Sequence, residues 1–370
     1  MKVLAINCGS SSIRWAVFDV EGERELDHGR IEEVRDADEA WIRVRRELRA
    51  LPADRTPEAV GHRVVHGGER FTESVRIDAA VLREIEAQIP LAPEHNPRCL
   101  HGIREAMGAF PDLLHVAVFD TAFHQTMPPE AYVYPIPYVF HERDRIRRYG
   151  FHGTSHRYAA ERGAHLLGIA PNAFTGITCH LGNGASIAAI RAGRSVDTSM
   201  GMTPLEGLMM GTRSGDMDPG VVLELAARAE LGPEAVATML NQESGLLGVS
   251  GVSSDLRRVE AAAAEGDARA KLAVELFAHR VRRGVGAALG VLGGAMAIIV
   301  TGGIGEHASA MRSRIFGGLE GLGLVLDDEL NRECLGREGR LSNDDASLPL
   351  FVVPAREEWL IARETAASLA

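Results

Sequence analysis

Two runs of apolar residues broken by a short polar turn open the chain, and the pattern recurs about half a chain later. The first copy is Val3-Leu-Ala-Ile-Asn-Cys-Gly-Ser-Ser-Ser-Ile-Arg-Trp-Ala-Val-Phe18, and the second is Ile177-Thr-Cys-His-Leu-Gly-Asn-Gly-Ala-Ser-Ile-Ala-Ala-Ile190. Each copy predicts a β-hairpin. Small residues let the backbone approach a ligand, and their N–H and hydroxyl groups suit phosphate oxygens. A single such turn is commonly only a hairpin, but two indicate related halves that hold a phosphate-bearing ligand in the cleft between them.

Helical and strand-like patterns alternate between and beyond the hairpins. Helices are expected over 38–51, 78–89, 155–167, from 219 to near 232, over 269–292 and over 357–369, and strands over 59–65, 115–119, 297–300 and 350–353. Prolines between 128 and 137 mark an irregular connector. This alternation predicts two α/β halves, each a sheet covered by helices, with a switch near residue 150.

Composition is that of a globular enzyme of two domains: 370 residues, 45% hydrophobic and 25% charged. The net charge of −11 argues against nucleic acid or an anionic membrane as a general partner, although a local basic cleft could hold a small anion. The uncharged stretch 284–305 is long enough to span a bilayer, but its glycines and its β-type end favour a buried helix tail and a buried strand.

The cysteines and the N-terminus predict a cytoplasmic protein. Four cysteines without a CxxC pair indicate reduced, partly buried thiols, and the first residues turn polar too early for a signal peptide. Lysine occurs only as Lys2 and Lys271, which excludes a Walker-type phosphate loop.

Polar residues at predicted strand ends are the candidates for chemistry, because ligands of α/β folds bind outside strand termini. Asp120 follows the run 114–119, and a carboxylate there can hold Mg²⁺ through water or cap a helix. Glu357 and Glu358 follow the last strand, where acidic residues also favour the first turn of any helix. Position alone leaves both interpretations open in each case.

Arginine and histidine in glycine-rich segments are the remaining candidates. Arg63 and Arg213 offer planar forks matched to carboxylate or phosphate, with an ordinary salt bridge as the alternative. His152 and His180 could be catalytic or merely hydrogen-bonded, and no HExxH spacing supports a transition metal. Together with the acidic strand ends, these residues predict anion binding with Mg²⁺ and phosphoryl transfer.

Seven segments resemble the acetate kinase family in order along the chain. They are Asn7-Cys-Gly-Ser-Ser-Ser12, His62-Arg-Val-Val-His-Gly-Gly68, Phe119-Asp-Thr-Ala-Phe-His124, Arg148-Tyr-Gly-Phe-His-Gly-Thr-Ser-His156, His180-Leu-Gly-Asn-Gly184, Thr203-Pro-Leu-Glu-Gly-Leu-Met-Met-Gly-Thr-Arg213 and Gly303-Ile-Gly-Glu306. The resemblance implies an α/β fold of two duplicated actin-like (ribonuclease H-like) domains with an active-site cleft between them. One domain would comprise 1–148 with the C-terminal helix 357–370. The other, 149–356, would carry the nucleotide site and the interface of a homodimer.

The resemblance also implies a reaction, reversible phosphoryl transfer between ATP and a short carboxylate, and roles for matching residues. The catalytic residues would be Arg63, Asp120, His152, His180 and Arg213. The acid would contact Arg63, Val65, Glu94, His95, Phe151 and Pro204. ATP or ADP would lie against Asn7, Ser10, Ser12, Arg14, His180, Leu181, Gly182, Asn183, Gly184, Asp255, Leu256, Arg257, Gly303, Ile304 and Gly305. Mg²⁺, with Mn²⁺ as a substitute, would be held by Asn7, Asp120 and Glu357.

Three residues depart from the family pattern. Glu94 stands in Leu91-Ala-Pro-Glu-His-Asn-Pro97 where leucine is usual, so a carboxylate would replace part of the apolar wall around the acid. It could turn away, pair with an arginine or read a polar group on a different acid. Arg14 replaces a lysine, and His307 an asparagine near the nucleotide.

Two alternatives to a carboxylate kinase stay open. A nucleotide-binding regulator of the same fold would have no chemical need for Arg63, Asp120, His152, Arg213 and Glu357 together. A sugar kinase of the superfamily would need a carboxylate base near the acceptor hydroxyl, a possibility that Glu94 keeps open. A carboxylate acceptor needs no base, because its pKa of about 4–5 leaves it ionised at neutral pH.

Overall fold

The computed structural model describes residues 1–9, 12–32, 36–228 and 232–370. Contacts between residues divide the chain into two compact units, each considered by itself below. Unit 1 comprises Met1–Gln125, Phe151–Ser155 and Arg356–Ala370, and unit 2 comprises Thr126–Gly150 and His156–Ala355. Within the described ranges, every helix is too short or too polar to span a bilayer.

Unit 1 is built on a mixed sheet of six strands in the order β3-β2-β1-β4-β6-β5. The strands are β1 (Lys2–Cys8), β2 (Ser12–Asp19), β3 (Arg24–Glu32), β4 (Ala59–Val64), β5 (Val75–Arg76) and β6 (Leu114–Phe119). β1, β2 and β3 are antiparallel neighbours, whereas β1, β4 and β6 run parallel. The first predicted hairpin is therefore confirmed, and three strand ends meet at one edge of the sheet.

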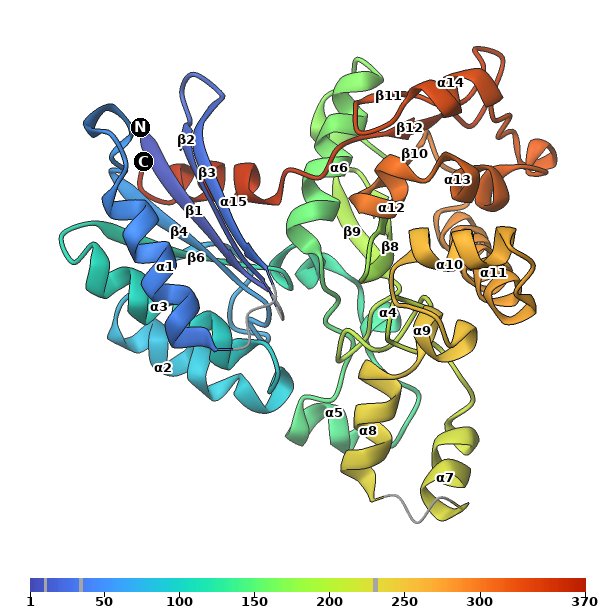
Figure 1. Ribbon diagram of the computed structural model, residues 1–370, viewed down its shortest axis with the longest axis horizontal. Helices are drawn as coiled ribbons and strands as arrows, with labels where there is room; N and C mark the ends of the chain where they lie inside the picture. The colour runs from blue at the N-terminus through green and yellow to red at the C-terminus, as the bar shows by residue number, and fades with distance from the viewer. Residues whose placement is uncertain (10–11, 33–35, 229–231) are drawn as a thin grey trace. The chain divides into compact units, whose positions relative to one another are not determined.

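Helices cover both faces of this sheet (Figure 1). They are α1 (Ala37–Arg49), α2 (Ala79–Ala87), α3 (Asn96–Ala109) and α15 (Glu357–Ala367). Successive side chains of a strand point to opposite faces. Accordingly, Leu4 packs in one apolar cluster with Trp41 of α1, and Val3 packs in another with Ile361 of α15. The last helix of the chain thus belongs to the first sheet.

Unit 2 repeats the same sheet. Its strand order, β9-β8-β7-β10-β12-β11, matches that of unit 1 strand for strand and in every pairing direction. The strands are β7 (Gly176–Leu181), β8 (Ala185–Arg191), β9 (Arg194–Thr198), β10 (Ile298–Thr301), β11 (Gly339–Arg340) and β12 (Leu350–Val352). A shift in strand register also recurs: β2 pairs with β3 with a shift at Val17/Phe18, and β8 pairs with β9 with a shift at Ala189/Ile190. The predicted duplication is confirmed.

The helices of unit 2 are more numerous. They are α4 (Pro129–Tyr132), α5 (Val139–Asp144), α6 (Gly153–Leu166, which begins among residues of unit 1), α7 (Pro219–Arg228), α8 (Pro233–Gln242), α9 (Gly245–Ser250), α10 (Leu256–Ala264), α11 (Ala268–Leu292), α12 (Gly302–His307), α13 (Ser309–Phe316) and α14 (Asp328–Glu333). α11 and α6 cover opposite faces of the sheet, and each helix packs closely against a strand at a glycine. A Cβ at Gly284 would lie 2.7 Å from Ile187, and one at Gly163 would lie 2.8 Å from Ile299.

Three sequence expectations need adjustment, and a fourth falls partly outside the described residues. α6 begins at Gly153 rather than Ser155, and the connector near 128–137 contains the short helix α4. The helix expected to reach Gly232 is described only as far as Arg228, since 229–231 lie outside the described residues. The uncharged stretch 284–305 does contain a buried strand, but the helix tail before it is partly exposed, with Val291 at 45%.

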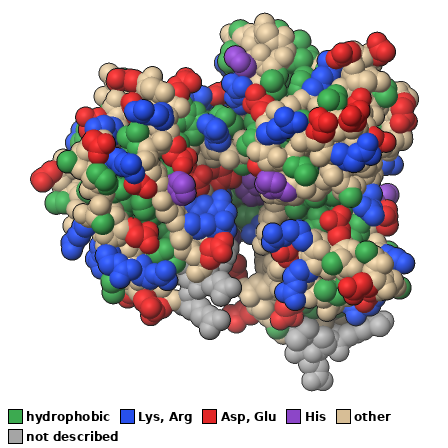
Figure 2. Space-filling view, turned by 45° about the horizontal axis from the view of Figure 1, so that its top comes forward, with side chains coloured by type: hydrophobic (Ala, Val, Ile, Leu, Met, Phe, Trp, Pro, Cys, Tyr) green, Lys and Arg blue, Asp and Glu red, His purple; other side chains and the backbone are tan. Residues whose placement is uncertain are grey.

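The cysteines are buried thiols, and charges of both signs are mixed on the surface shown in Figure 2. All four cysteines are free and buried. On the face drawn in Figure 2, acidic and basic side chains are interspersed rather than gathered by sign. Any binding of anions therefore depends on local groups of side chains.

Candidate active site

Three polar residues stand at one edge of the sheet in unit 1. Asn7 lies near the end of β1, Arg63 near the end of β4, and Asp120 directly follows β6. The three strands are parallel neighbours in the order β1-β4-β6, so their carboxyl ends lie side by side. Arg63 lies within β4, inside the strand expected over 59–65.

Arg63 and Asp120 form a buried ion pair. Nε of Arg63 donates to Oδ1 at 2.9 Å and to Oδ2 at 3.0 Å, and Nη2 also donates to Oδ2. Asp120 is fully buried, and Arg63 is 14% exposed. Burial by itself lowers the pKa of Arg63, but the negative charges of Asp120 and Glu357 outweigh burial and raise that pKa. The guanidinium therefore stays charged, and each partner depends on the other.

Asp120 is fixed by its backbone as well. Its N–H donates to the carbonyl of Val64 at 3.0 Å, and its carbonyl accepts from Gly153 N–H at 3.1 Å. Thr154 Oγ1 lies 3.2 Å from Oδ1 and donates to it. A Cβ at Gly153 would lie 2.0 Å from the Asp120 carbonyl oxygen, so only glycine fits this contact. The segment after residue 150 thus locks the carboxylate in place.

Asn7 connects this pair to the start of α15. Its Oδ1 accepts from Arg63 Nη1 at 3.0 Å, while Nδ2 donates to Glu357 Oε2 at 3.0 Å and to Glu358 Oε1 at 3.2 Å. Burial, and then the charge of Glu357, raise the pKa of Glu358. Two neighbouring carboxylates therefore repel each other at this helix start.

The charges of this cluster suit a divalent cation. One guanidinium, that of Arg63, interacts with the carboxyl groups of Asp120 and Glu357. Carboxyl and amide oxygens are ligands that Mg²⁺ accepts. Among the described residues, no three His, Cys, Asp or Glu side chains lie close enough together to hold a metal ion by themselves. Asn7, Asp120 and Glu357 could contribute oxygens to an ion that keeps most of its waters, as Mg²⁺ commonly does.

Apolar side chains follow Arg63 in unit 1. Val65 is 4% exposed and Phe151 is 1% exposed. The ring of Phe151 meets that of His66 edge to face, with centroids 5.5 Å apart. Two buried apolar groups thus adjoin the segment that carries the guanidinium, where the alkyl end of a small acid could pack.

Asn96 holds the neighbouring turn in place. Its Oδ1 accepts from His66 N–H at 3.1 Å, and its Nδ2 donates to the His66 carbonyl at 3.0 Å. Asn96 is fully buried, and its two bonds to His66 hold the turn with Glu94 and His95 next to the segment that follows Arg63. Glu94 is nevertheless exposed, and His95 is half-buried. A carboxylate that remains in water loses little solvation.

His152 has an unusual backbone. Its φ is +55°, in the left-handed region that residues other than glycine seldom adopt. Its neighbours Phe151 and Gly153 are buried in the contacts just described. Strain of this kind persists where surrounding structure imposes it and is frequent at functional sites.

In unit 2, the second hairpin turn lies against the start of α12. His180 of β7 pairs with Thr301 of β10, and Gly302 after it has φ +82°. A Cβ at Gly182 would lie 3.6 Å from His180 Nε2 and 4.0 Å from the backbone N of Gly303. Three predicted residues, from two strands far apart in sequence, therefore come together.

Asn183 extends this group toward the predicted catalytic arginine. A Cβ at Gly211 would lie 1.8 Å from Asn183 Oδ1 and 3.0 Å from the carbonyl oxygen of Ser254. Gly211 N–H donates to the Asn183 carbonyl at 2.9 Å. Two residues further on, Arg213 Nη1 donates to the Pro204 carbonyl at 3.3 Å. Asn183 is thus in contact with Gly211, two residues before Arg213.

The remaining predicted residues take varied positions. Asp255 caps α10 and pairs with Arg257, which is 88% exposed. The side chains of Leu181 and Leu256 are buried in the core, so only their backbones could reach a ligand. Gly184 ends the second turn, and Ile304 and Gly305 lie within α12.

The first hairpin turn is described only at its ends. Ser10 lies outside the described residues, and Ser12 begins β2. Arg14 is exposed and stands opposite Asn7 in the sheet register. Its charge opposes the rise in the pKa of Glu358 that burial and Glu357 cause.

Thr154 and Asn96 are contacts of unit 1 that the sequence did not reveal as site residues, and Glu358 was a candidate whose bond to Asn7 the sequence did not reveal. Asn96 stands before a proline at a helix start, which indicates a turn, and Glu358 looks like any acid in a first turn. Their partners lie 30 to 351 residues away along the chain, and no local pattern indicates such pairings.

Comparison with known proteins gives a consistent result. The model of the acetokinase family matches residues 48–363. The acetate kinase of Thermotoga maritima is 45% identical over 395 residues, which cover 99% of this chain and 98% of that one. Two solved structures superpose on the whole chain. Porphyromonas gingivalis acetate kinase has a TM-score of 0.93 and 40% identity with full coverage of both chains, and a propionate kinase from Francisella tularensis has 0.91 and 39% with 99% coverage of both.

Proposed function

The chain belongs to the acetokinase family, and on this premise we propose which of its residues carry out the family's reaction and on which acids. It has the actin-like fold of two similar α/β domains and is a phosphotransferase whose acceptor is a carboxyl group. It phosphorylates a short-chain carboxylate with ATP. Its preferred acids, we propose, are acetate and propionate.

The observation that carries the assignment is the setting of Arg63. Three of the five N–H groups of its guanidinium bind Asp120 and Asn7, and two have no partner among the described residues. A planar fork fixed on one side can present its other donors to a carboxylate or a phosphoryl oxygen without further ordering. Arg63 therefore receives the acid and the phosphoryl group in transfer.

The charge of unit 1 requires a counter-ion for this step. The carboxylates of Asp120 and Glu357 outnumber the single guanidinium, so an anionic substrate would be repelled. Mg²⁺, when bound, neutralises phosphate charge and organises the nucleotide's oxygens. Asn7, Asp120 and Glu357 would hold it, mainly through water, with Mn²⁺ as a substitute.

The residues of unit 2 would bind the nucleotide and the moving phosphoryl group. The turn of Gly182, Asn183 and Gly184, with Gly303, presents small residues and backbone N–H groups to phosphate. His180 and Arg213 add donors beside the turn, and Asp255 and Arg257 border the nucleoside. Positioning and charge neutralisation suffice, because the acid is already ionised and needs no base.

The acid's alkyl end would pack on Val65 and Phe151, which supports a short aliphatic acid. Glu94 is exposed, so its carboxylate can remain hydrated instead of entering the apolar pocket. We expect Glu94→Leu to change the ratio of the KM values for acetate and propionate by less than about threefold, the scale of a screened surface charge. A larger change would show that Glu94 contacts the acid.

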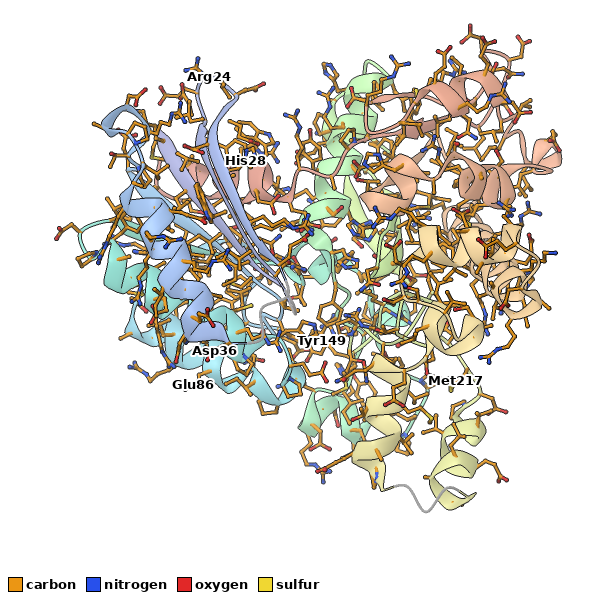
Figure 3. The ribbon with its side chains drawn as sticks, in the orientation of Figure 1. Arg24, His28, Asp36, Glu86, Tyr149 and Met217 are labelled. Carbon is orange, nitrogen blue, oxygen red and sulfur yellow. The ribbon has the colours of Figure 1, made fainter. Side chains whose placement is uncertain are left out.

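Acyl phosphate trapped as the hydroxamate tests the assignment directly. The purified chain receives Mg-ATP and acids of two to six carbons, including hydroxy acids. Arg63→Ala should lower turnover by orders of magnitude, whereas Arg24→Ala should not, because Arg24 is exposed on β3 (labelled in Figure 3). Turnover near the wild-type rate in Arg63→Ala would contradict the role of Arg63.

The resemblance to acetate kinases also supports a homodimer in the cytoplasm, with domains near the boundaries expected from the sequence. Sedimentation of the purified chain tests the dimer. A monomer at enzymatic concentrations with full activity would contradict it.

A further inference from the structure

A long irregular segment of unit 2 carries two residues of the proposed site, Pro204 and Arg213. It joins β9 to α7, and in the described range 199–218 it forms no helix or strand. Met217, labelled in Figure 3, lies close to its end. Loops of more than about 15 residues within a compact unit are usually functional, and their backbone groups need partners outside a ladder.

The start of this segment is gathered around the guanidinium of Arg148. Nη1 donates to the carbonyl oxygens of Thr198 at 2.9 Å, Ser199 at 3.2 Å and Met200 at 3.0 Å. Arg148 belongs to no helix or strand, yet only 18% of its side chain is exposed. One side chain therefore fixes three consecutive carbonyls of an otherwise irregular chain.

Glu206 closes the segment on itself. Its Oε1 accepts from Arg148 Nη2 at 2.5 Å, and its Oε2 accepts from the hydroxyl of Tyr134. The same hydroxyl accepts from Met202 N–H at 2.9 Å. Burial and the carboxylate of Glu206 raise the pKa of Tyr134, so the phenol keeps the proton that it donates. Residues 198–206 thus wrap around one Arg–Glu–Tyr network.

The Glu206 carboxylate packs directly against the backbone of the segment at Gly201. A Cβ at Gly201 would lie 1.7 Å from Oε2 of Glu206 and 2.3 Å from the Tyr134 hydroxyl, so no side chain fits there. The Gly201 carbonyl accepts from the N–H groups of Tyr149 (labelled in Figure 3) and Gly150, each at 3.1 Å. The network therefore constrains the backbone as well as side chains.

Gly207, the next residue after Glu206, closes the turn that carries Arg213. Gly207 N–H donates to Asp216 Oδ1 at 2.7 Å, and Asp216 N–H donates back to the Gly207 carbonyl at 2.9 Å. Arg213, inside this closed loop, donates to the Pro204 carbonyl at 3.3 Å. A shift of Glu206 would therefore move Pro204 and the backbone around Arg213 together.

We propose that Arg148, Glu206 and Tyr134 are positioning residues, which hold Pro204 and Arg213 in the geometry needed for the acid and the transferred phosphoryl group. This inference rests on the proposed function, since Pro204 and Arg213 are assigned there. None of the three touches substrate in this scheme. They act through the segment 198–213.

Kinetics separate positioning from a merely structural role. Tyr134→Phe deletes one hydroxyl, and Arg148→Lys deletes the fork. Each should lower kcat by about 10- to 100-fold, the scale of misplacing a positioned group, and raise KM for the acid. KM for Mg-ATP should change less than KM for the acid, because the turn Gly182–Gly184 contacts the segment at Gly211, further along the chain than the residues bonded to Arg148, Glu206 and Tyr134. A purely structural role would lower the melting temperature and leave kcat per folded molecule unchanged.

Matched controls exist for both variants. Tyr138→Phe removes a hydroxyl from a tyrosine that is 57% exposed. Arg283→Lys alters an exposed arginine that lines the same cavity of about 230 Å³ as Arg148 and Glu206 but makes no hydrogen bond to the segment. Both controls should keep the wild-type kcat and both KM values.

Hydrogen exchange provides a readout that does not need activity. In Tyr134→Phe the amide of Met202 loses its acceptor, so its exchange and that of neighbouring amides should accelerate at least about tenfold, with α11 unchanged. Faster exchange together with the kinetic split supports the proposal. Unchanged exchange, or faster exchange with unchanged kcat and acid KM, overturns it. If the wild-type chain makes no acyl phosphate, the proposed function fails, and exchange alone then decides whether the network holds the segment.

Discussion

Replacing Asp120 by alanine should destabilise the protein markedly, because it leaves Arg63 charged and only 14% exposed without its carboxylate. Losing one partner of a buried pair costs about 3–5 kcal/mol. For cooperative unfolding of 370 residues, an entropy of about 2.1 cal/mol/K per residue totals about 0.8 kcal/mol/K. The melting temperature should therefore fall by about 4–6 °C, measured by calorimetry and by circular dichroism.

Removing both charges tests the reasoning behind that figure. Arg63→Met combined with Asp120→Ala removes both charges of the pair, so no buried guanidinium is left without its carboxylate, and the double variant should be more stable than Asp120→Ala by about 1–3 kcal/mol, although it is inactive. The exposed Asp54→Ala serves as control and should change stability by less than about 0.5 kcal/mol. Asp120→Ala as stable as the wild type, or a double variant as unstable as the two single variants summed, would refute the account of the pair.

Two further predictions concern groups around this pair. Burial lowers the pKa of His62, and also that of His115, whose Nδ1 lies 2.9 Å from His62 Nε2. Both rings stay neutral in the folded state but take up protons when unfolded, so the free energy of unfolding should fall as the pH drops below about 6.5, by up to about 1.4 kcal/mol per pH unit for each ring. His62→Gln should flatten this slope in urea titrations at pH 7.5 and 5.5, and equal slopes would contradict it. Gly153→Ala should lower kcat at least about tenfold, since the new Cβ would lie 2.0 Å from the Asp120 carbonyl oxygen. The control Gly108→Ala, whose Cβ would have no atom within 4 Å, should be active and about 0.5–1 kcal/mol more stable than the wild type. Normal turnover in Gly153→Ala would contradict the contact with Asp120.

Much of the fold is predictable from short-range pattern. The hairpins follow from apolar runs on either side of Gly/Ser/Asn turns, and the α7 start follows from Asp218-Pro219, where Asp218 Oδ1 indeed accepts from Gly220 N–H at 2.8 Å. Asp120 at a strand end and Arg63 in a glycine-rich segment were candidates for chemistry, and the structure joins them in an ion pair. These inferences hold because periodicity and strand direction are local properties.

The partners of those residues were not predictable, since they depend on contacts between distant parts of the chain. Asn7 and Glu357 are 350 residues apart, and the carboxylate of Glu357 looked equally suited to a helix start. Glu206 lies inside a recognisable segment, yet nothing local indicates that Tyr134, 72 residues earlier, binds it. Whether a buried charge is paired is decided by tertiary packing, which the periodicity of a segment does not record.

In the proposed reaction a carboxylate oxygen of the acid attacks phosphorus, so the acid keeps both of its oxygens and ADP leaves. The most direct measurement supplies Mg-ATP and propionate labelled with ¹⁸O at both carboxyl oxygens, then analyses the acyl phosphate by mass spectrometry. The account predicts an acyl phosphate that retains both labels, formed in proportion to ADP by the wild type and by Arg24→Ala but not by Arg63→Ala. ADP formation that does not depend on the acid, or that yields no labelled acyl phosphate, would contradict it.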